Sequence, residues 1–303
     1  MNDRLSPPDA FNPQQPNIAR VYDYLLGGKD NFAADRAVGD QISTTLPAVQ
    51  TGVRAQRDLL GRVVRYLVRD AGIRQLIDIG AGLPTAENVH EIAQRIDADT
   101  RTVYIDNDPV VLAHARAILA GVTTTIVVQG DLLQPAAFLA DPEVREHLDW
   151  EQPIAVLLCG IMHYVLDEED PGAAMDQIIE ALPDGSYVFI HHLVSSDDPV
   201  TADLQEAMQQ GLGRTRFRTH EEVLSLFRGL ELVDPGLVPV PDWRPDPDTP
   251  GASEHPVLKL ASAGLARKTV RRGWLARLRR WFSSRRSADP ASSAQDAPGG
   301  ASA

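Results

Sequence analysis

Short apolar runs alternate with segments of helical periodicity between residues 56 and 191, and this alternation most constrains the fold. The apolar runs predict strands at 74–79, 102–106, 124–129, 154–159 and 186–191. The segments before and between them predict helices at 56–68, 86–96, 109–120 and 172–181. Strands that alternate with helices form a mostly parallel sheet with helices on both faces. We therefore expect an α/β fold of the doubly wound, Rossmann-like class.

The rest of the chain differs in composition from this alternating region. Two later strand signals, at 230–240 and 257–261, are expected to complete the sheet at one edge. We expect four zones, which are a disordered N-terminus (1–16), a helical leader (17–50), an α/β domain (51–268) and a tail (269–303). The tail ends in a run rich in Ala, Ser, Pro and Gly, which predicts disorder.

The single cysteine, Cys159, excludes an internal disulfide framework and suits a reducing cytoplasm. The polar N-terminus lacks the apolar run of a signal peptide, and no segment reaches the roughly 20 apolar residues of a membrane-spanning helix. The formal net charge of −13 is unfavourable for binding nucleic acid. We therefore expect a cytoplasmic protein whose main partner is not nucleic acid.

A basic segment at 265–286 contrasts with the acidic body, because it holds nine Lys or Arg residues and no Asp or Glu. From Leu265 onward, apolar residues recur at helical spacing as Val270, Trp274, Leu278, Trp281 and Phe282. This pattern is typical of a basic amphipathic helix that lies on an anionic membrane surface, which predicts peripheral membrane binding. Contact with an acidic partner or with the protein's own acidic body, and a simple solvated extension, are the alternatives.

The ends of the first three predicted strands carry glycine and aspartate. The first strand ends in Asp78 and is followed by Gly80 and Gly82, which permit close approach of the backbone to a ligand. Asp106 ends the second strand and can accept hydrogen bonds from ribose hydroxyls, while Asp131 follows the third and can bind an adenine amino group. Because ligands bind at the carboxyl ends of such strands, these residues predict a nucleoside site. A turn or a helix cap is the alternative role for Asp106 and Asp131.

The glycine loop distinguishes between two adenosine-containing cofactors. The dinucleotide fingerprint has a third glycine where this chain has Thr85, and the preceding Pro84 has no N–H to offer a pyrophosphate. The loop therefore suits S-adenosylmethionine, which has an adenosine and an amino-acid end but no phosphate. Asp78 and the backbone near Gly80 are expected to face that amino-acid end.

Five segments resemble the S-adenosyl methyltransferase family that is abundant in actinobacteria. They are 17–32, 104–116, 153–165, 243–246 and 264–268, and the resemblance spans about residues 16–268. The chain departs from the family pattern at Cys159-Gly160, where small apolar residues are usual, and at Leu260-Ala-Ser, where aromatic residues are usual. The resemblance implies a class I methyltransferase fold and S-adenosylmethionine binding, but no particular substrate.

The expected cofactor site combines strand ends with the leader. Its residues are Asp78, Gly80, Ala81, Gly82, Asp106, Asn107, Asp131, Leu132, Gly160, Tyr22, Gly28, Lys29 and Asn31. We hypothesise that the leader closes over the cofactor as a lid, with Arg20 and Lys29 near carboxylates such as that of the methionine end. A helix packed at the sheet edge is the alternative interpretation.

The expected catalytic residues, His163 and Tyr164, follow the fourth predicted strand, where a methyl acceptor should lie. His163 can act as a base, because its unperturbed pKa is about 6.5, and a packing role is the alternative. His191 and His192 are adjacent in a strand and point to opposite faces, so no metal site is predicted. Cys159 is expected to be a buried apolar residue.

These features favour an S-adenosylmethionine-dependent methyltransferase that acts on a small molecule. A non-catalytic S-adenosylmethionine-binding regulator with the same fold is the first alternative. A nicotinamide-dependent oxidoreductase is the second, and the loop containing Pro84 disfavours it.

Overall fold

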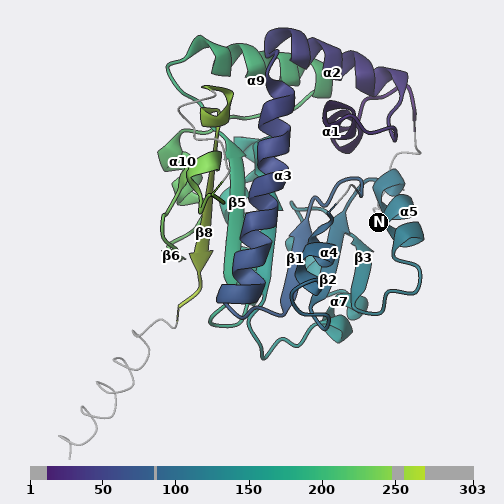
Figure 1. The fold of residues 1–303 in the computed structure, drawn as a ribbon, viewed down its shortest axis with the longest axis vertical. Helices are drawn as coiled ribbons and strands as arrows, with labels where there is room; N and C mark the ends of the chain where they lie inside the picture. The colour runs from purple at the N-terminus through teal and green to yellow at the C-terminus, as the bar shows by residue number, and fades with distance from the viewer. Residues whose placement is uncertain (1–11, 85–86, 248–255, 270–303) are drawn as a thin grey trace, which may run out of the picture. The chain divides into compact units, whose positions relative to one another are not determined.

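A computed structural model describes residues 12–84, 87–247 and 256–269, with an eight-stranded sheet at their centre (Figure 1). Five strands pair in parallel in the order β3-β2-β1-β4-β5, and they are β1 (Gln75–Ile79), β2 (Arg101–Asp106), β3 (Thr125–Gln129), β4 (Ala155–Cys159) and β5 (Tyr187–Leu193). Each prediction for these strands is confirmed to within two residues. The strand order reverses between β1 and β4, so the carboxyl ends of these two strands are where a ligand is expected.

Antiparallel strands complete one edge of the sheet. β8 (Ala261–Arg267) pairs with β5, and β6 (Glu231–Leu232) and β7 (Val238–Pro239) both pair with β8. The strand expected at 257–261 begins only at Ala261, because η5 (Pro256–Lys259) forms a tight 3₁₀ turn before it.

The prediction of a basic amphipathic helix from Leu265 onward is wrong for its first residues. Leu265 is fully buried inside β8, where it pairs opposite Phe189 of β5. A strand within a mixed sheet buries both of its faces, so this stretch is apolar for a reason unrelated to a membrane. The rest of the predicted helix, from residue 270 onward, lies outside the described residues, as do residues 1–11 of the expected disordered N-terminus.

Helices cover both faces of the sheet, as predicted. α6 (Pro135–Leu139), α7 (Pro142–His147) and α8 (Pro171–Ala181) pack on one face, against side chains that include Ile77, Val156 and Val188. The long α3 (Val49–Arg65) and α4 (Val89–Gln94) pack on the other face, against Leu76, Leu157 and Phe189. α5 (Pro109–Ile118) also joins this second layer through Leu112 and Ala115.

α3 begins at Val49, so the boundary expected between residues 50 and 51 falls inside a helix. The helix starts earlier than its periodicity predicts because Val49 and Val53 are buried against the N-terminal helices and not against the sheet. A short π-helical turn from Tyr66 to Asp70 continues α3.

Four helices form a cap over the carboxyl ends of the parallel strands (Figure 1). This helical cap consists of α1 (Ile18–Leu26), α2 (Ala33–Thr45), α9 (Pro199–Leu212) and the first turns of α3. The cap has an apolar core of its own, which includes Val21, Ile42, Leu204 and Met208. The short α10 (His220–Ser225) contributes Val223 to the core cluster that also contains Val188 of β5 and Ala266 of β8.

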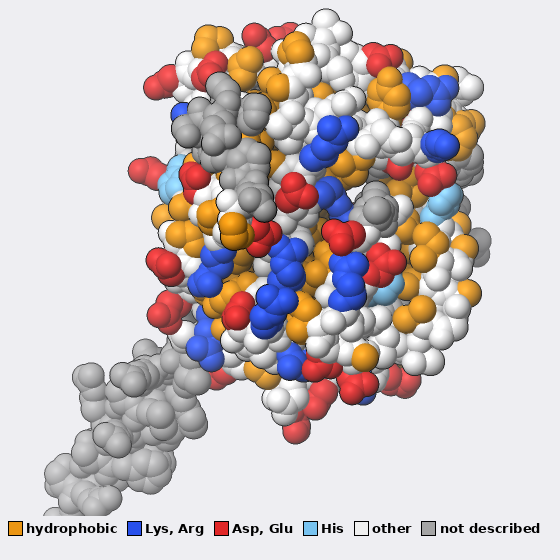
Figure 2. Space-filling view, viewed as in Figure 1, with side chains coloured by type: hydrophobic (Ala, Val, Ile, Leu, Met, Phe, Trp, Pro, Cys, Tyr) orange, Lys and Arg blue, Asp and Glu red, His pale blue; other side chains and the backbone are white. Residues whose placement is uncertain are grey.

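Charged side chains of both signs are interspersed on the described part of the face that α3 crosses (Figure 2). Exposed ion pairs on the described part of the protein include Arg65 with Asp246, and Arg95 with Glu87 at 2.9 Å.

Candidate functional site

A cavity of about 450 Å³ lies between the helical cap and the carboxyl ends of the strands. This volume is typical of a site for small ligands. Its polar end is formed by residues at or just after the carboxyl ends of β1, β2 and β3, including Asp78, Gly80, Ala81, Gly82, Asp106, Asn107, Asp131 and Leu132. Its apolar chamber is formed largely by the helical cap, with Leu25, Ile42, Leu46, Leu204, Met208 and Leu260. The cavity therefore joins two chemically different compartments.

The loop after β1 is shaped for a close backbone approach. Gly80 has φ +72°, and a Cβ atom there would lie 2.8 Å from the side chain of Ile161. Gly82 has φ +68°, and its N–H donates to Oδ2 of Asp106 at 2.9 Å. A larger residue at Gly80 would be strained and would collide with the cavity wall.

Asp106 is held by backbone N–H groups on both sides. Gly82 donates to one carboxylate oxygen, and the N–H of Asp108 donates to the other at 2.9 Å. Burial raises the pKa of Asp106, and these backbone hydrogen bonds act in the opposite direction. Because each oxygen can accept a further hydrogen bond, the carboxylate can serve both as a loop anchor and as a ligand for two hydroxyl groups.

Asp131 has a similar double role. Its Oδ1 accepts a hydrogen bond from the N–H of Leu133 at 2.9 Å, which is the Asx turn that an aspartate favours at this position. The residue also lines the polar end of the cavity, together with Leu132. The turn role and the ligand role therefore do not exclude each other.

Asp78 is a buried carboxylate at the end of β1. Burial raises its pKa to about 7, Arg57 acts in the opposite direction, and Asp106 raises it further. No hydrogen bond is among the causes of this shift, and Arg57 is the described cation that acts on the carboxylate. A buried carboxylate without a partner is costly, so Asp78 would be stabilised by a cationic ligand.

Sequence analysis missed two polar residues of α3 that line the cavity, Gln56 and Arg57. Arg57 donates to the backbone oxygen of Glu87 at 3.0 Å and lies close enough to lower the pKa of Asp78. Gln56 donates to the backbone oxygen of Cys159 at 3.4 Å. Only the packing of α3 across the sheet brings these side chains to the strand ends.

Cys159 and Gly160 end β4 beside Gln56. Gly160 has φ +80°, and a Cβ atom there would lie 2.5 Å from Nε2 of Gln56. Burial raises the pKa of the Cys159 thiol to about 12, so the group is a neutral part of the cavity wall. The small residues of this turn therefore leave room for Gln56 at the middle of the cavity.

In the leader, Tyr22 is the one expected site residue that lines the cavity, and its OH donates to the backbone oxygen of Val53 at 3.3 Å. Gly28, Lys29 and Asn31 lie outside the lining. Asn31 donates to Oδ2 of Asp23 at 2.9 Å, and a Cβ atom on Gly28 would lie 2.0 Å from Oδ1 of Asp23. This part of the leader is therefore a compact turn built around the Asp23 carboxylate.

Arg20 meets carboxylates, as expected, but both belong to the protein. Its Nε lies 2.9 Å from Oδ2 of Asp35, and its Nη1 lies 3.5 Å from Oδ2 of Asp108. All three side chains are buried. The ion pairs connect α1 and α2 to the loop after β2, which places α1 against the cavity.

We expect the Gly28→Ala variant to unfold at a lower temperature than the wild type, with a loss of about 1–3 kcal/mol, because the added methyl group overlaps the Asp23 carboxylate. The neighbouring Lys29 is exposed, so Lys29→Ala should leave the unfolding midpoint unchanged. Thermal unfolding followed by circular dichroism measures both. Equal midpoints for Gly28→Ala and Lys29→Ala would show that the turn tolerates a side chain.

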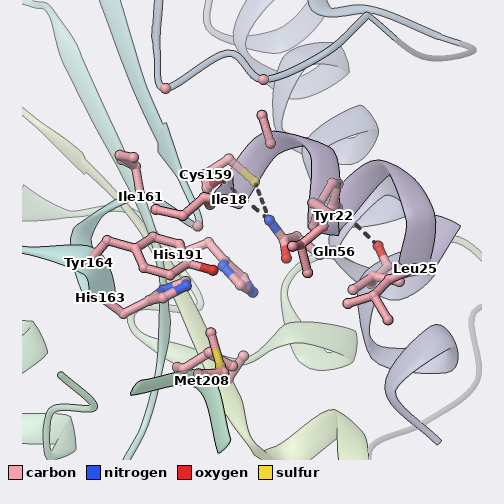
Figure 3. Close-up of a pocket in the computed structure, with 18 of the residues that line it drawn as sticks. Ile18, Tyr22, Leu25, Gln56, Cys159, Ile161, His163, Tyr164, His191 and Met208 are labelled. Carbon is pink, nitrogen blue, oxygen red and sulfur yellow. Dashed lines mark hydrogen bonds between the residues drawn. The ribbon is translucent and has the colours of Figure 1, made fainter. Parts of the chain in front are cut away.

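His163, Tyr164 and His191 form a group of rings in the cavity wall, facing Tyr22 and Gln56, with Met208 nearby (Figure 3). The rings of His163 and Tyr164 are 4.4 Å apart. Burial, together with His192, His191 and Arg218, lowers the pKa of His163 well below its ordinary value. The expected pair His163 and Tyr164 therefore lies at the cavity, and the structure adds His191 to it.

The structure places His192 on the opposite face of β5 from His191. Its Nε2 lies 3.2 Å from Arg218, a buried residue that also donates to the backbone oxygens of Met162 and Val165. In the part of the chain that the structure describes, no three His, Cys, Asp or Glu residues are grouped closely enough to hold a metal ion.

Comparison with known proteins assigns the chain to a family. A profile described as S-adenosyl methyltransferase matches residues 5–269. The chain belongs to the S-adenosyl methyltransferase family. This membership confirms the resemblance seen in the sequence and implies the use of S-adenosylmethionine.

Two solved structures are similar to this S-adenosyl methyltransferase family member. A candidate methyltransferase from Thermobifida fusca is 40% identical, with a TM-score of 0.81, and the match covers 85% of this chain and 96% of that one. A DUF574 family protein from Streptomyces avermitilis is 39% identical, with a TM-score of 0.80, covering 84% and 98% of the two chains. No curated protein matches the chain. Among the described helices, none has the length and apolar composition needed to cross a bilayer.

The polar end suits the cofactor of this S-adenosyl methyltransferase family. Asp78 is a buried carboxylate with a raised pKa, and a cationic ammonium or sulfonium group would compensate it. Asp106 keeps acceptor capacity for a ribose diol, and Gly80 and Gly82 leave the loop backbone open to the cavity. The residues present therefore fit S-adenosylmethionine.

Proposed function

We propose that the protein transfers the methyl group of S-adenosylmethionine to a small-molecule acceptor. One observation carries this proposal, namely a single cavity in which a polar end built from three strand ends opens into an apolar chamber. A site that only sensed the cofactor would not need a second compartment beyond it. The family membership supports the same reaction class.

Different residues of the cavity would bind different parts of S-adenosylmethionine. Asp106 would accept the ribose hydroxyls, and Asp131 and Leu132 would border the adenine. Asp78 would pair with the ammonium group, and Arg57 of α3 would face the carboxylate of the methionine end. Ala81, Asn107 and Gly160 would complete the wall.

Methyl transfer mainly requires that the acceptor is aligned with the methyl group and that water is excluded. It depends less on acid–base chemistry, since the cofactor supplies an activated methyl group. The helical cap provides both alignment and exclusion of water, because it covers the strand ends and lines the chamber with buried apolar side chains. We propose that α1 acts as the lid expected of the leader, with Ile18, Tyr22 and Leu25 forming its inner surface. The Arg20 ion pairs would hold this lid against the loop after β2.

The nicotinamide alternative fits the cavity poorly. Pro84 lies in the loop after β1 and offers no N–H to a pyrophosphate. Thr85, which occupies the position of the third fingerprint glycine, lies outside the described residues. The four carboxylates that line the polar end, Asp78, Asp106, Asp108 and Asp131, outnumber the cation Arg57, and this balance disfavours a dinucleotide pyrophosphate.

Calorimetric titration with S-adenosylmethionine, S-adenosylhomocysteine and NADH tests the proposal. We expect micromolar binding of both sulfur compounds and no heat with NADH, because the polar end accommodates cations and hydroxyls but not phosphates. Methyl transfer is then sought with radiolabelled S-adenosylmethionine and small aromatic acceptors. Binding of the cofactor without transfer to any acceptor would favour a regulator, and binding of NADH alone would favour the oxidoreductase.

A further inference from the structure

A row of side chains on one face of the sheet leads from the polar end into the apolar chamber. Asp78 of β1, Cys159 of β4 and His191 of β5 all belong to the sheet face that α3 covers, since side chains alternate along a strand. Cys159 and His191 are direct partners in the parallel register. His191 therefore lies two strands away from Asp78, on the side of the cavity away from the cofactor residues.

The imidazole of His191 is buried and incompletely hydrogen-bonded. The residue is 2% exposed, and its Nδ1 has no hydrogen-bond partner among the described residues. The same holds for Nδ1 of His163, which lines the same wall. Buried polar atoms normally have hydrogen-bond partners, and among the described residues His163 and His191 are the two with an unpaired buried nitrogen that also line the cavity, so a ligand there can supply the missing partner.

We propose that the methyl acceptor is a small, largely apolar aromatic molecule whose phenolic hydroxyl group binds to the imidazole of His191. This inference rests on the proposed methyl transfer and names the substrate class of the same site. Met208, Leu204 and Ile42 would pack on the rest of the acceptor.

The distribution of charge excludes a cationic acceptor such as an alkylammonium ion. The cavity-lining carboxylates, Asp78, Asp106, Asp108 and Asp131, all lie at or just after the carboxyl ends of β1, β2 or β3. Among the described residues of the chamber the charged side chain is Arg214, which pairs with Glu169, so the chamber lining offers no carboxylate to a cationic acceptor. A neutral hydroxyl group needs no such partner.

The rings around His191 favour an aromatic acceptor over an aliphatic alcohol. Tyr22, Tyr164 and His163 present ring faces or edges, and Met208 presents a thioether, all of which pack well against an aromatic ring. Burial also lowers the pKa of His191 to about 4, so its imidazole is neutral and only weakly basic at pH 7. A neutral imidazole can accept a hydrogen bond, and a phenol hydroxyl, whose pKa is about 10, is a stronger hydrogen-bond donor than an aliphatic alcohol.

The reaction balances with these groups alone. A lone pair of the phenolic oxygen forms a bond to the methyl carbon, and the bond from that carbon to sulfur breaks with its electron pair left on sulfur. As the oxygen–methyl bond forms, the hydroxyl proton becomes strongly acidic and passes to His191, and it reaches solvent when the product leaves the cavity. The products are an aryl methyl ether, S-adenosylhomocysteine and one proton, and no oxidant or reductant is needed.

Three naphthalene probes test the inference by calorimetry at pH 7.5, each with and without saturating S-adenosylhomocysteine. They are 2-naphthol, its methyl ether 2-methoxynaphthalene, and 2-naphthylmethylamine, which is cationic at this pH. We expect 2-naphthol to bind at least about ten-fold more tightly than either of the others, because only it donates a neutral hydrogen bond to His191. The ether tests the hydrogen bond alone, since its ring system is the same.

His191→Phe should abolish the preference for 2-naphthol over its ether, and His191→Gln should retain part of it. The matched control is His220→Gln, because His220 is an exposed histidine at the start of α10 and does not line the cavity. The control should keep the full preference. Thermal unfolding establishes that each variant is folded.

Equal binding of 2-naphthol and its ether to the wild type, tighter binding of the amine, or a preference retained in both His191 variants would overturn the inference. Failure of the wild type to bind 2-naphthol at all would do the same. Failure of the proposed function is a separate result, since it appears as absent binding of S-adenosylhomocysteine itself.

Discussion

The Asp106→Ala variant should bind S-adenosylhomocysteine about 100-fold more weakly than the wild type. Its carboxylate would accept two ribose hydroxyls, and hydrogen bonds to a charged group contribute about 1.5 kcal/mol each, which gives roughly 3 kcal/mol in total. The substitution also releases the N–H groups of Gly82 and Asp108, which now converge on this side chain. Calorimetric titration measures the affinity, and thermal unfolding measures the loss of loop anchoring.

Asp99→Ala is the matched control, because Asp99 is an exposed aspartate just before the other end of β2. Its affinity for S-adenosylhomocysteine should be unchanged. An Asp106→Ala variant that remains folded and binds within three-fold of the wild type would remove Asp106 from the cofactor site and leave it with the anchoring role alone.

The second large effect concerns Asp78, whose substitution should stabilise the free protein while it weakens cofactor binding. The pKa of this carboxyl is raised to about 7 in the folded protein, above its unfolded value of about 3.9. The folded state therefore binds the proton more tightly, and stability falls as the pH rises from about 4 through 7. At pH 8 the full cost is present, and Asp78→Asn should recover on the order of 2 kcal/mol in denaturant unfolding.

The same shift makes ligand binding depend on pH. A cationic ligand prefers the ionised carboxylate, so the affinity of the wild type for S-adenosylhomocysteine should fall by up to about ten-fold per unit below pH 7. Asp78→Asn should bind weakly at all pH values between 5.5 and 8 and show little pH dependence. A variant that is no more stable than the wild type at pH 8, or that keeps the pH dependence of binding, would contradict this assignment.

The fold of the α/β domain is largely readable from the sequence, because parallel strands buried on both faces must be apolar runs. The run from Ala155 to Cys159 is an example, and its bounds are predicted to within one residue. The later strands are harder to place. β8 contains small residues and pairs on both sides, so its start at Ala261 depends on the turn before it and not on its own pattern.

The polar end of the cavity is also encoded locally. Asp78, Asp106 and Asp131 each lie at or just after the end of a strand of one parallel sheet, and the carboxyl ends of such strands meet at one edge whatever the details of packing. The leader is the opposite case. Gly28 packs closely against Asp23 and Asn31 donates to it within the same turn, and neither lines the cavity. The motif itself does not reveal this local partner.

The sequence by itself therefore determined the family, the sheet and the strand-end residues of the candidate site, since all three depend on short-range patterns. The tertiary structure alone decided which residues from distant segments lie beside these strand-end residues in the candidate site. Arg57 lies on a helix that crosses the sheet, His191 lies on the strand face that this helix covers, and Leu265 lies in a strand between two others. These positions follow from how elements pack, and packing is a property of the surfaces that meet and not of either sequence segment alone.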